Sequence, residues 1–577
     1  MIPLFLFNCC LLILILSGGL ELEGERHYHY DEMVVMRDGI SLHTVVFLPN
    51  DPTNKRYPAV VDRSPYGYNI TEWLSDFFLR SGYVAIGQDL RGQFKSQGDF
   101  SIWHSDANDS EDTGNWIVQQ EWSNGEVYTI GASADGIAAM QMPLNKPAWL
   151  KGQYLIWSTS NLYAAAYQHG TYMTWFNRWF ERKLTNKSNI EPCKNVVWSH
   201  ESYDDYWQQI DLTTHYDDLI LFPSGFYAGW YDLFITGNLL AWEGYYEATL
   251  NSLLFIDPIG HCQDASKYFD QDLVAGRSLL PLLQAAQVFG ARNVYRNSIE
   301  NITFYVMSSD DSAGNYWTSM NAFPETNPYD LYLHAGGIVS IVAPLDSEQE
   351  QQATSSYIFD PSDPVPTIGG NNLGASTDAS CGPLDQSILD TRSDILRYQT
   401  KPFEYELIFT GPLFATLFVS SNAIDTDFMV KISDVNDKTG VVRILVDNAL
   451  RMRWRNGGIE PILMSGNSDD VYEISISLWN TSYVLPVNHS LRVDITSSNY
   501  PRFSINPNNG NSLADTFNNG YDEVNVTATN TIYHSLKYPS RITLPVLVQS
   551  KQDALPKIDL LKLKSQMDNW LMAENFQ

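Results

Sequence analysis

The N-terminal half of the chain alternates strand-like segments with helix-like ones. Apolar residues fill 41–48, 57–63 and 82–88, which predicts strands, the last of them buried. Between these strands, 72–81 and 109–120 mix apolar with polar residues and predict helices. Such alternation predicts the α/β class, with a mostly parallel sheet covered by helices.

A stretch crowded with aromatic residues, 157–216, interrupts this alternation. We expect it to form a helical insertion, or cap, that lies over the sheet. Most of its aromatic side chains must form its own core, while a few should line an apolar pocket, as ligand sites usually require. The aromatic residues are Trp157, Tyr163, Tyr167, Tyr172, Trp175, Phe176, Trp179, Phe180, Trp198, Tyr203, Tyr206 and Trp207.

Beyond about Pro324 the pattern changes to short strands separated by turn residues, which predicts an all-β sandwich. The clearest strand segments are 331–334, 414–419, 471–476 and 490–495. In the tail, 551–577, apolar residues recur near helical spacing. The tail is therefore either a docked amphipathic helix or a loose extension.

Three short segments carry candidate catalytic residues in one order along the chain. The first, 131–136, reads Gly-Ala-Ser-Ala-Asp-Gly and presents Ser133 between a strand-like and a helix-like segment. A strand, a tight turn and a helix are the setting in which a nucleophilic serine hydroxyl is exposed at the end of a sheet. The small residues around Ser133 let the turn bend and let the helix approach the strand.

Asp232 and His261 complete the order. We expect each just beyond a strand, the first after 219–222 and the second after 252–256, in loops at the carboxyl ends of the strands. Ligands bind there in open α/β sheets. The order serine, acid, histidine is that of an α/β-hydrolase triad and differs from the chymotrypsin and subtilisin orders. The sequence therefore predicts a serine hydrolase with Ser133 as its nucleophile.

Composition narrows the set of partners. The chain of 577 residues is long enough for two or three domains. Its 36 basic and 67 acidic residues give a formal net charge of −31, which argues against binding nucleic acid or an anionic membrane surface. The sequence has no C-x-x-C pair and no histidine cluster with metal-ligand spacing, so we expect no structural metal and no cofactor.

The N-terminus resembles a secretory signal peptide, with an apolar core over 9–16 and small residues up to 19. The mature chain should then be soluble and either secreted or held in the lumen of an endomembrane compartment. Removal of this segment would leave Cys193, Cys262 and Cys381, which allow at most one disulfide. Seven N-x-S/T sequons support export of a glycoprotein: Asn69, Asn108, Asn186, Asn301, Asn480, Asn488 and Asn525.

Further motifs carry a resemblance that covers about 34–550. They lie at 36–42 (Met-Arg-Asp-Gly-Ile-Ser-Leu), 62–66 (Asp-Arg-Ser-Pro-Tyr), 87–98, 360–370, 410–412 and 425–428. With the three catalytic segments, they make the chain similar to the cocaine-esterase and X-Pro dipeptidyl-peptidase group of α/β-hydrolases. The resemblance implies an α/β-hydrolase domain with a helical cap, followed by a C-terminal jelly-roll β-sandwich.

This resemblance divides the chain into five parts. The expected parts are a signal peptide (1–19), a hydrolase domain (25–156 and 217–323), a helical cap (157–216), a jelly roll (324–550) and a tail (551–577). The sequence leaves it undecided whether the protein forms a homodimer.

The resemblance also implies roles for residues around the nucleophile. Members of the group show G-x-S-Y-x-G there, and 131–136 fits this spacing with Ala134 in place of the tyrosine. The backbone N–H of Ala134 and the hydroxyl of Tyr66 are implied to form the oxyanion hole. We interpret Asp89 and Arg91 as a structural pair that braces the end of the sheet, because the triad is already filled.

The expected chemistry is acyl transfer through an acyl-enzyme, with His261 as the base and Asp232 holding its imidazole. Amino-acid ester hydrolases of the group carry carboxylates two and three residues after the triad acid, where this chain has Phe234 and Ile235. We therefore predict a carboxylic-ester hydrolase acting on a small ester or amide substrate. The alternatives are an X-Pro dipeptidyl-peptidase, an acylase and, from another class, a non-catalytic carbohydrate-binding protein with a decayed hydrolase domain.

Overall fold

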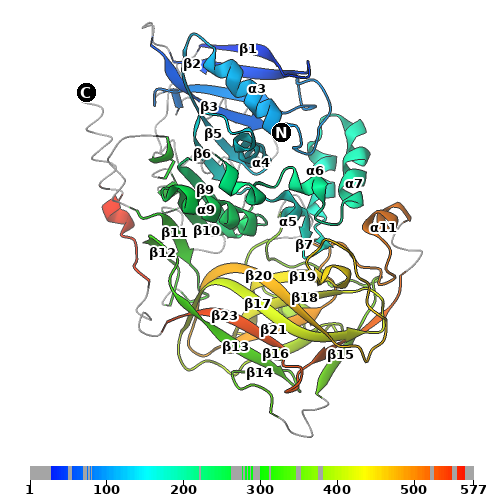
Figure 1. Cartoon of the computed structure of the whole chain (residues 1–577). Coiled ribbons are helices and arrows are strands. Elements are labelled where there is room, and N and C mark those ends of the chain that lie inside the picture. The colour runs from blue at the N-terminus through cyan, green and yellow to red at the C-terminus, as the bar shows by residue number, and fades with distance from the viewer. Residues whose placement is uncertain are drawn as a thin grey trace.

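The structure, a computed structural model, describes most of residues 28–565 (Figure 1). The segments left undescribed within that span are 50–54, 69–74, 76–77, 80, 220–221, most of 262–298, 311–312, 346–352, 374–380, 520–524, 549–554 and 564. The expected signal peptide, Cys262, most of the expected helix at 72–81 and most of the tail lie outside the described residues.

The α/β half is built on a sheet in which the described strands follow the order β1-β2-β4-β3-β5-β6-β9-β10-β11-β12. The run from β4 to β11 is parallel throughout, and β1, β2 and β12 pair antiparallel at the edges. The strands are β1 (Tyr28–Val35), β2 (Ser41–Leu48), β3 (Tyr57–Ser64), β4 (Val84–Asp89), β5 (Ser123–Ala132), β6 (Leu150–Ile156), β9 (Ser224–Tyr231), β10 (Leu253–Gly260), β11 (Ile302–Val306) and β12 (Tyr316–Met320). The predicted mostly parallel sheet is confirmed.

Helices cover this sheet. Those that pack on it are α3 (Asp106–Val118) and α4 (Ala134–Gln141), which contact β5, and α9 (Ile235–Thr249), which contacts β9. The predicted helix at 109–120 corresponds to α3. Between β6 and β9 the chain forms a helical segment with α5 (Leu162–Ala166), β7 (Tyr167–Gln168), β8 (Thr171–Tyr172), α6 (Trp175–Lys183), α7 (Ile190–Ser199) and α8 (Asp205–Gln208).

The chain leaves the first sheet after β12 and enters a second, mostly antiparallel sheet. Its strand order is β15-β22-β17-β23-β13-β14-β16-β21-β18-β19, with β20 paired to β17. The strands are β13 (Thr326–His334), β14 (Ile338–Ser340), β15 (Thr354–Phe359), β16 (Leu396–Gln399), β17 (Leu407–Ser421), β18 (Asp427–Asn436), β19 (Val441–Arg451), β20 (Tyr472–Leu485), β21 (His489–Thr496), β22 (Ala528–Tyr533) and β23 (Arg541–Leu547). The C-terminal half is therefore β-rich, as expected, with several strands longer than predicted.

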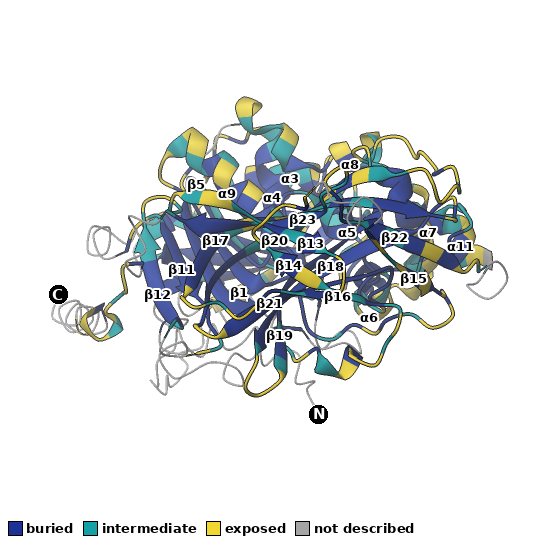
Figure 2. Ribbon diagram, turned by 90° about the horizontal axis from the view of Figure 1, so that it is seen from below, coloured by how far each residue is buried: buried dark blue, intermediate teal, exposed yellow. Residues whose placement is uncertain are grey.

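The two largest of the buried apolar clusters among the described residues join the parts of the molecule. The larger one runs without a break from the parallel sheet into the β-rich half, and both sheets are buried along most of their length (Figure 2). The second joins the helical segment to the turns beyond β5 and β9 and to residues of the β-rich half. In Figure 1 the α/β half lies above the β-rich half, with α5 and β7 near their junction. No described helix is long and apolar enough to cross a membrane.

One predicted strand is wrong in position. The strand that leads to Asp232 begins at Ser224 rather than within 219–222, where Leu219 follows a 3₁₀ turn and 220–221 are undescribed. Every residue of β9 is buried, so its sequence shows no alternation of apolar and polar positions.

Candidate active site

Ser133 lies in the tight turn between β5 and α4. Its φ of 59° is a left-handed conformation that non-glycine residues rarely adopt, and its N–H donates to the carbonyl of Ile156 on the neighbouring strand (2.9 Å). A Cβ on Gly131 would lie 2.6 Å from the carbonyl oxygen of Asp135. A larger residue at position 131 would therefore force strand and helix apart, which explains the small residues before the serine.

The structure brings His261 between Ser133 and Asp232. The Nε2 atom of His261 lies 2.8 Å from Ser133 Oγ, and its Nδ1 atom lies 2.6 Å from Asp232 Oδ2. The three residues follow β5, β9 and β10, strands of one parallel run whose carboxyl ends meet at the same edge. Sequence reasoning placed all three at that edge, and the fold adds the mutual geometry.

Burial gives this arrangement a low-dielectric setting. Asp232 is fully buried, His261 is 4% exposed, and the second carboxylate oxygen of Asp232 accepts the N–H of Phe234 (2.7 Å). The imidazole of His261 lies between two aromatic rings, with centroids at 6.0 Å for Trp157 and 5.4 Å for Phe234. Such packing fixes the orientation of the ring. A serine hydroxyl, an oriented imidazole and a buried carboxylate can together move a proton off the hydroxyl.

Tyr66 and Ala134 follow neighbouring strands, β3 and β5, by two residues each, so they lie at the same edge of the sheet. The hydroxyl oxygen of Tyr66 accepts a hydrogen bond from Nε1 of Trp179 in α6 (2.9 Å). That bond uses a lone pair of the hydroxyl oxygen and not its proton. Ala134 is the first residue of α4, where backbone N–H groups have no partner within the helix.

Aromatic side chains of the helical segment reach the candidate site. The Trp175 ring meets Phe234 edge-on at 5.5 Å, and Phe234 in turn meets His261. Trp179 contacts Trp103 and Phe100 as well as Tyr66. The segment 157–216 thus supplies apolar walls close to the reacting groups.

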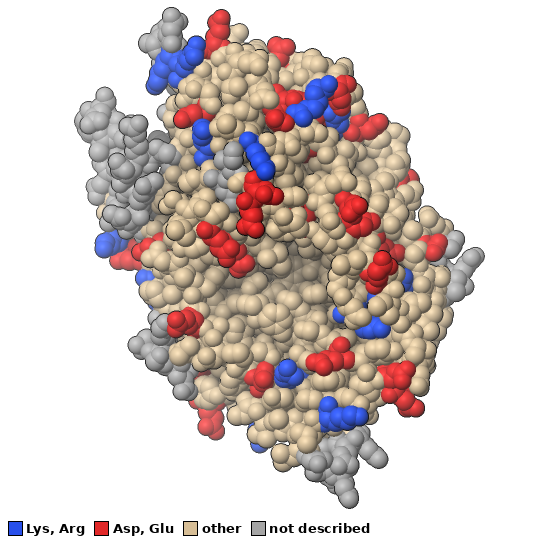
Figure 3. Space-filling model, in the orientation of Figure 1, with Lys and Arg blue, Asp and Glu red and all other residues tan. Residues whose placement is uncertain are grey.

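Figure 3 shows acidic side chains scattered over one face, with a hollow near its middle whose visible lining is largely uncharged. Among the described residues, no group of three or more His, Cys, Asp and Glu side chains is arranged to hold a metal ion.

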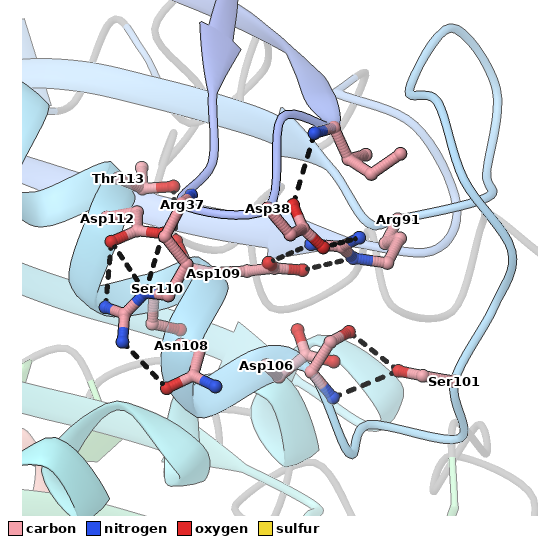
Figure 4. A network of polar contacts seen from close by, with 12 residues as sticks. Arg37, Asp38, Arg91, Ser101, Asp106, Asn108, Asp109, Ser110, Asp112 and Thr113 are labelled. Carbon is pink, nitrogen blue, oxygen red and sulfur yellow. Dashed lines mark hydrogen bonds and ion pairs between the residues drawn. The ribbon is translucent and has the colours of Figure 1, made fainter.

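Asp89 and Arg91 are not paired with each other, which corrects our interpretation of them as a pair. Asp89 lies 2.9 Å from Nδ1 of His43, and burial raises the pKa of its carboxyl group. Arg91 instead contacts Asp109 of α3 and Asp38 (Figure 4). Both still act structurally, because each ties the edge of the sheet to a different neighbour.

Another histidine–aspartate group, which the sequence analysis missed, lies where the β-rich half meets the segment that follows β11. Nδ1 of His489 lies 2.7 Å from Asp434 Oδ1, and Asp434 Oδ2 accepts hydrogen bonds from the hydroxyls of Tyr483 (2.7 Å) and Ser309. The Oγ atom of Ser309 is 3.5 Å from the same Nδ1. Ser309, Asp434 and the stretch that holds Tyr483 and His489 are far apart in the chain, so no local motif marks the group.

Comparison with known protein families gives two matches. Residues 38–191 match the model of the X-Pro dipeptidyl-peptidase (S15 family), and residues 298–543 match that of the X-Pro dipeptidyl-peptidase C-terminal non-catalytic domain. A cocaine esterase from Rhodococcus sp. (strain MB1 Bresler) is 27% identical to the chain, over 89% of this chain and 98% of the esterase.

Solved structures agree on the architecture. An α-amino acid ester hydrolase superposes with a TM-score of 0.77 at 21% identity, covering 92% of this chain and 99% of its own. An aminopeptidase from the marine sediment archaeon Thaumarchaeota archaeon gives a TM-score of 0.76 at 20% identity, with the same coverage. At such identities these likenesses show the fold: an α/β-hydrolase-like half followed by a β-rich half.

Proposed function

The chain belongs to the cocaine-esterase and X-Pro dipeptidyl-peptidase group of α/β-hydrolases, and we propose that it hydrolyses an ester through Ser133, His261 and Asp232. One observation carries the proposal: the imidazole of His261 lies within hydrogen-bonding distance of the serine on one side and of a buried carboxylate on the other. Proton transfer from the serine is the role that uses both contacts.

The reaction proceeds in two steps. His261 takes the proton of Ser133 as the hydroxyl oxygen attacks the carbonyl carbon, and then returns it to the leaving alcohol. An acyl-enzyme forms on Ser133, and a water molecule activated by the same imidazole releases the acid. Asp232 keeps Nδ1 of His261 protonated and stabilises the imidazolium that forms in each step.

The tetrahedral intermediate carries a negative charge that must be stabilised. We assign this role to the hydroxyl of Tyr66 and the backbone N–H of Ala134. The hydrogen bond from Trp179 to the oxygen of Tyr66 supports the assignment, because it orients the hydroxyl and strengthens it as a donor. The position of Ala134 at the start of α4 adds the favourable end of the helix dipole.

The substrate that fits best has an apolar or aromatic acyl group. Phe234 and Ile235 stand where amino-acid ester hydrolases carry carboxylates, and both are buried, so this position offers no charge to a substrate amine. Trp175 and Trp179 extend the apolar wall from the helical segment, which we propose acts as a cap. An X-Pro peptidase or an acylase is the second candidate, since the family models name that peptidase.

Covalent labelling tests the nucleophile. A fluorophosphonate probe should label the native protein and should not label Ser133→Ala. Ser309→Ala is the matched control, because Ser309 also lies near a histidine–aspartate pair but contacts the carboxylate rather than the far imidazole nitrogen. Equal labelling of native protein and Ser133→Ala, or none of either, would favour the non-catalytic carbohydrate-binding alternative.

A substrate panel tests the acyl preference. We expect 4-nitrophenyl esters of acetate, butyrate and benzoate to be hydrolysed, and X-Pro 4-nitroanilides to be poor substrates. Turnover of the anilides alone would replace the esterase assignment with the peptidase one, without affecting the three catalytic residues.

We further propose that 1–19 is a cleaved export signal and that the β-rich half, 324–550, is a jelly roll. Expression in a eukaryotic secretory host tests the first point. N-terminal sequencing of the secreted protein should begin after residue 19, and a full-length chain in the cell pellet would contradict it.

A further inference from the structure

Asn371 connects the β-rich half to the backbone of the candidate catalytic acid. Its side-chain Nδ2 donates to the carbonyl oxygen of Trp230 (2.9 Å) and to that of Asp232 itself (3.2 Å). The residue is fully buried and lies about 140 positions along the chain from both acceptors (separations of 141 and 139). One side chain of the second half thus holds both ends of the turn that presents the acid.

The position of this turn decides where the carboxylate of Asp232 lies. Within the turn, the N–H of Asp232 donates to the carbonyl of Gly229 (2.9 Å), and a Cβ on Gly229 would lie 2.4 Å from the carbonyl oxygen of Ile259. The turn is therefore pressed against β10, the strand that leads to His261. A displacement of about 1 Å at a catalytic group can reduce the rate on the order of 10²-fold.

The backbone that carries Asn371 is itself fixed. Gly370 and Gly382 exchange two backbone hydrogen bonds (2.9 and 3.1 Å), which clamps the segment just before Asn371. Leu373 belongs to the same buried apolar cluster as Phe234, whose ring packs on His261. The backbone on both sides of Asn371 is thus held by hydrogen bonds and apolar packing.

Cys381 lies beside the same carboxylate. Burial, and next the negative charge of Asp232, raises the pKa of its thiol well above the ordinary value, so the thiol stays neutral. Cys381 therefore adds no competing charge beside the acid.

We propose that Asn371 is a positioning residue for Asp232, so that the half matched by a model described as non-catalytic contributes to proton transfer; this rests on the proposed roles of Ser133, His261 and Asp232. Asn371 does not touch the substrate. It acts by fixing the backbone from which the carboxylate reaches His261.

The main variants are Asn371→Asp and Asn371→Ala. Aspartate keeps the shape of the side chain but cannot donate to both carbonyls, because its carboxylate has no hydrogen and its acid form has one, and alanine removes the group. For hydrolysis of 4-nitrophenyl acetate, we expect kcat to fall about 10- to 100-fold while KM changes less than about threefold, because orientation is lost and the binding pocket is kept.

Gln386→Ala is the matched control. Gln386 is also fully buried and its Nε2 also donates to two carbonyls, of Ile368 (2.8 Å) and Leu384 (3.0 Å), but both belong to the β-rich half. Its loss should lower the melting temperature at least as much as that of Asn371 and leave kcat unchanged. If Gln386→Ala lowers kcat to the same extent, the effect of Asn371 is general destabilisation and the inference is wrong.

A double-mutant cycle with Asp232→Asn separates positioning from structure. If Asn371 acts through the acid, Asn371→Asp should reduce kcat less than about twofold once Asp232 has been replaced. A full, multiplicative loss in that background would overturn the inference. Ser133→Ala, assayed in parallel, separates this inference from the proposed function. Turnover by Ser133→Ala at the wild-type rate would refute the proposed function. If Ser133→Ala is inactive but the Asn371 variants keep the wild-type kcat, only this inference is refuted.

Discussion

Two of the histidines that contact a buried aspartate do so at nearly the same distance, yet only one of these two has the geometry for catalysis. Nδ1 of His261 lies 2.6 Å from Asp232 and Nδ1 of His489 lies 2.7 Å from Asp434. At His261 the serine is on the opposite nitrogen, Nε2. At His489 the serine, Ser309, lies near Nδ1, the nitrogen that also contacts the carboxylate, and its hydroxyl donates to that carboxylate.

The difference shows that proton transfer depends on which ring nitrogen faces the serine and which faces the carboxylate, and not only on having a serine, a histidine and an aspartate together. At the first site the carboxylate holds one ring nitrogen and the other is turned to the serine, so a proton can pass along the line. At the second site Asp434 accepts hydrogen bonds from two hydroxyls and contacts the histidine, which satisfies a buried charge. Ser133 also sits in a left-handed turn, as expected of an exposed nucleophile.

Amide substitution of each aspartate gives the largest contrast. Asp232→Asn should lower kcat on the order of 10⁴-fold, because the amide favours the wrong tautomer of His261. Asp434→Asn should leave kcat for 4-nitrophenyl acetate unchanged. A comparable loss in both variants would show that the two sites do not differ in the way described.

Removal of a tyrosine hydroxyl at each site comes next. Tyr66→Phe should lower kcat on the order of 10²–10³-fold, since one donor to the oxyanion is lost. Tyr483→Phe, which removes a hydroxyl that donates to Asp434, should alter thermal stability and leave kcat as it is. If Tyr66→Phe keeps activity within a few-fold of the parent, Tyr66 is not an oxyanion donor.

Stability should respond at the second site. Asp434→Ala leaves His489 and the hydroxyls of Tyr483 and Ser309 without their acceptor in a buried setting. We expect the free energy of unfolding to fall by about 2–3 kcal/mol, measured by denaturant titration. An unchanged unfolding free energy would mean that this group is not structural either.

His104, whose described contacts include no carboxylate, extends the comparison to the pH dependence of stability. Burial, and next the positive charge of His200, lowers the pKa of His104 to about 4; its ring packs on Tyr206 at 4.0 Å. The unfolded chain takes up this proton more readily, so stability present above pH 6.5 is lost as the pH falls towards 4. Between pH 7 and pH 5 the loss should be about 2 kcal/mol.

His104→Gln is the variant that isolates this contribution. Its unfolding free energy should fall less between pH 7 and pH 5 than that of the parent protein, as followed by denaturant titration at each pH. Parallel pH profiles for the two proteins would show that His104 does not titrate as described.

The local part of the site could be predicted from the sequence. The turn around Ser133 was found because strand, glycine, serine and helix follow one another within 20 residues, and Asp232 and His261 were found in short segments that follow strand-like stretches. The resemblance supplied the role of Tyr66. The start of β9 was misplaced, since a strand buried on both faces shows no period of two. Asp89 and Arg91 were wrongly paired because adjacency in sequence does not set the direction of a side chain.

By itself, the sequence determined the class of the fold, the order of the two halves and the residue types of the catalytic group. These depend on the spacing of apolar residues and on short turn motifs, and both can be recognised within a few neighbouring residues of the sequence. Only the tertiary structure decided that Asn371 donates a hydrogen bond to the backbone of Asp232. It also decided that His489, Asp434 and Ser309 form a hydrogen-bond network without the geometry for proton transfer from the serine. Those outcomes depend on which atoms of distant strands meet, and that is fixed by packing of the whole chain.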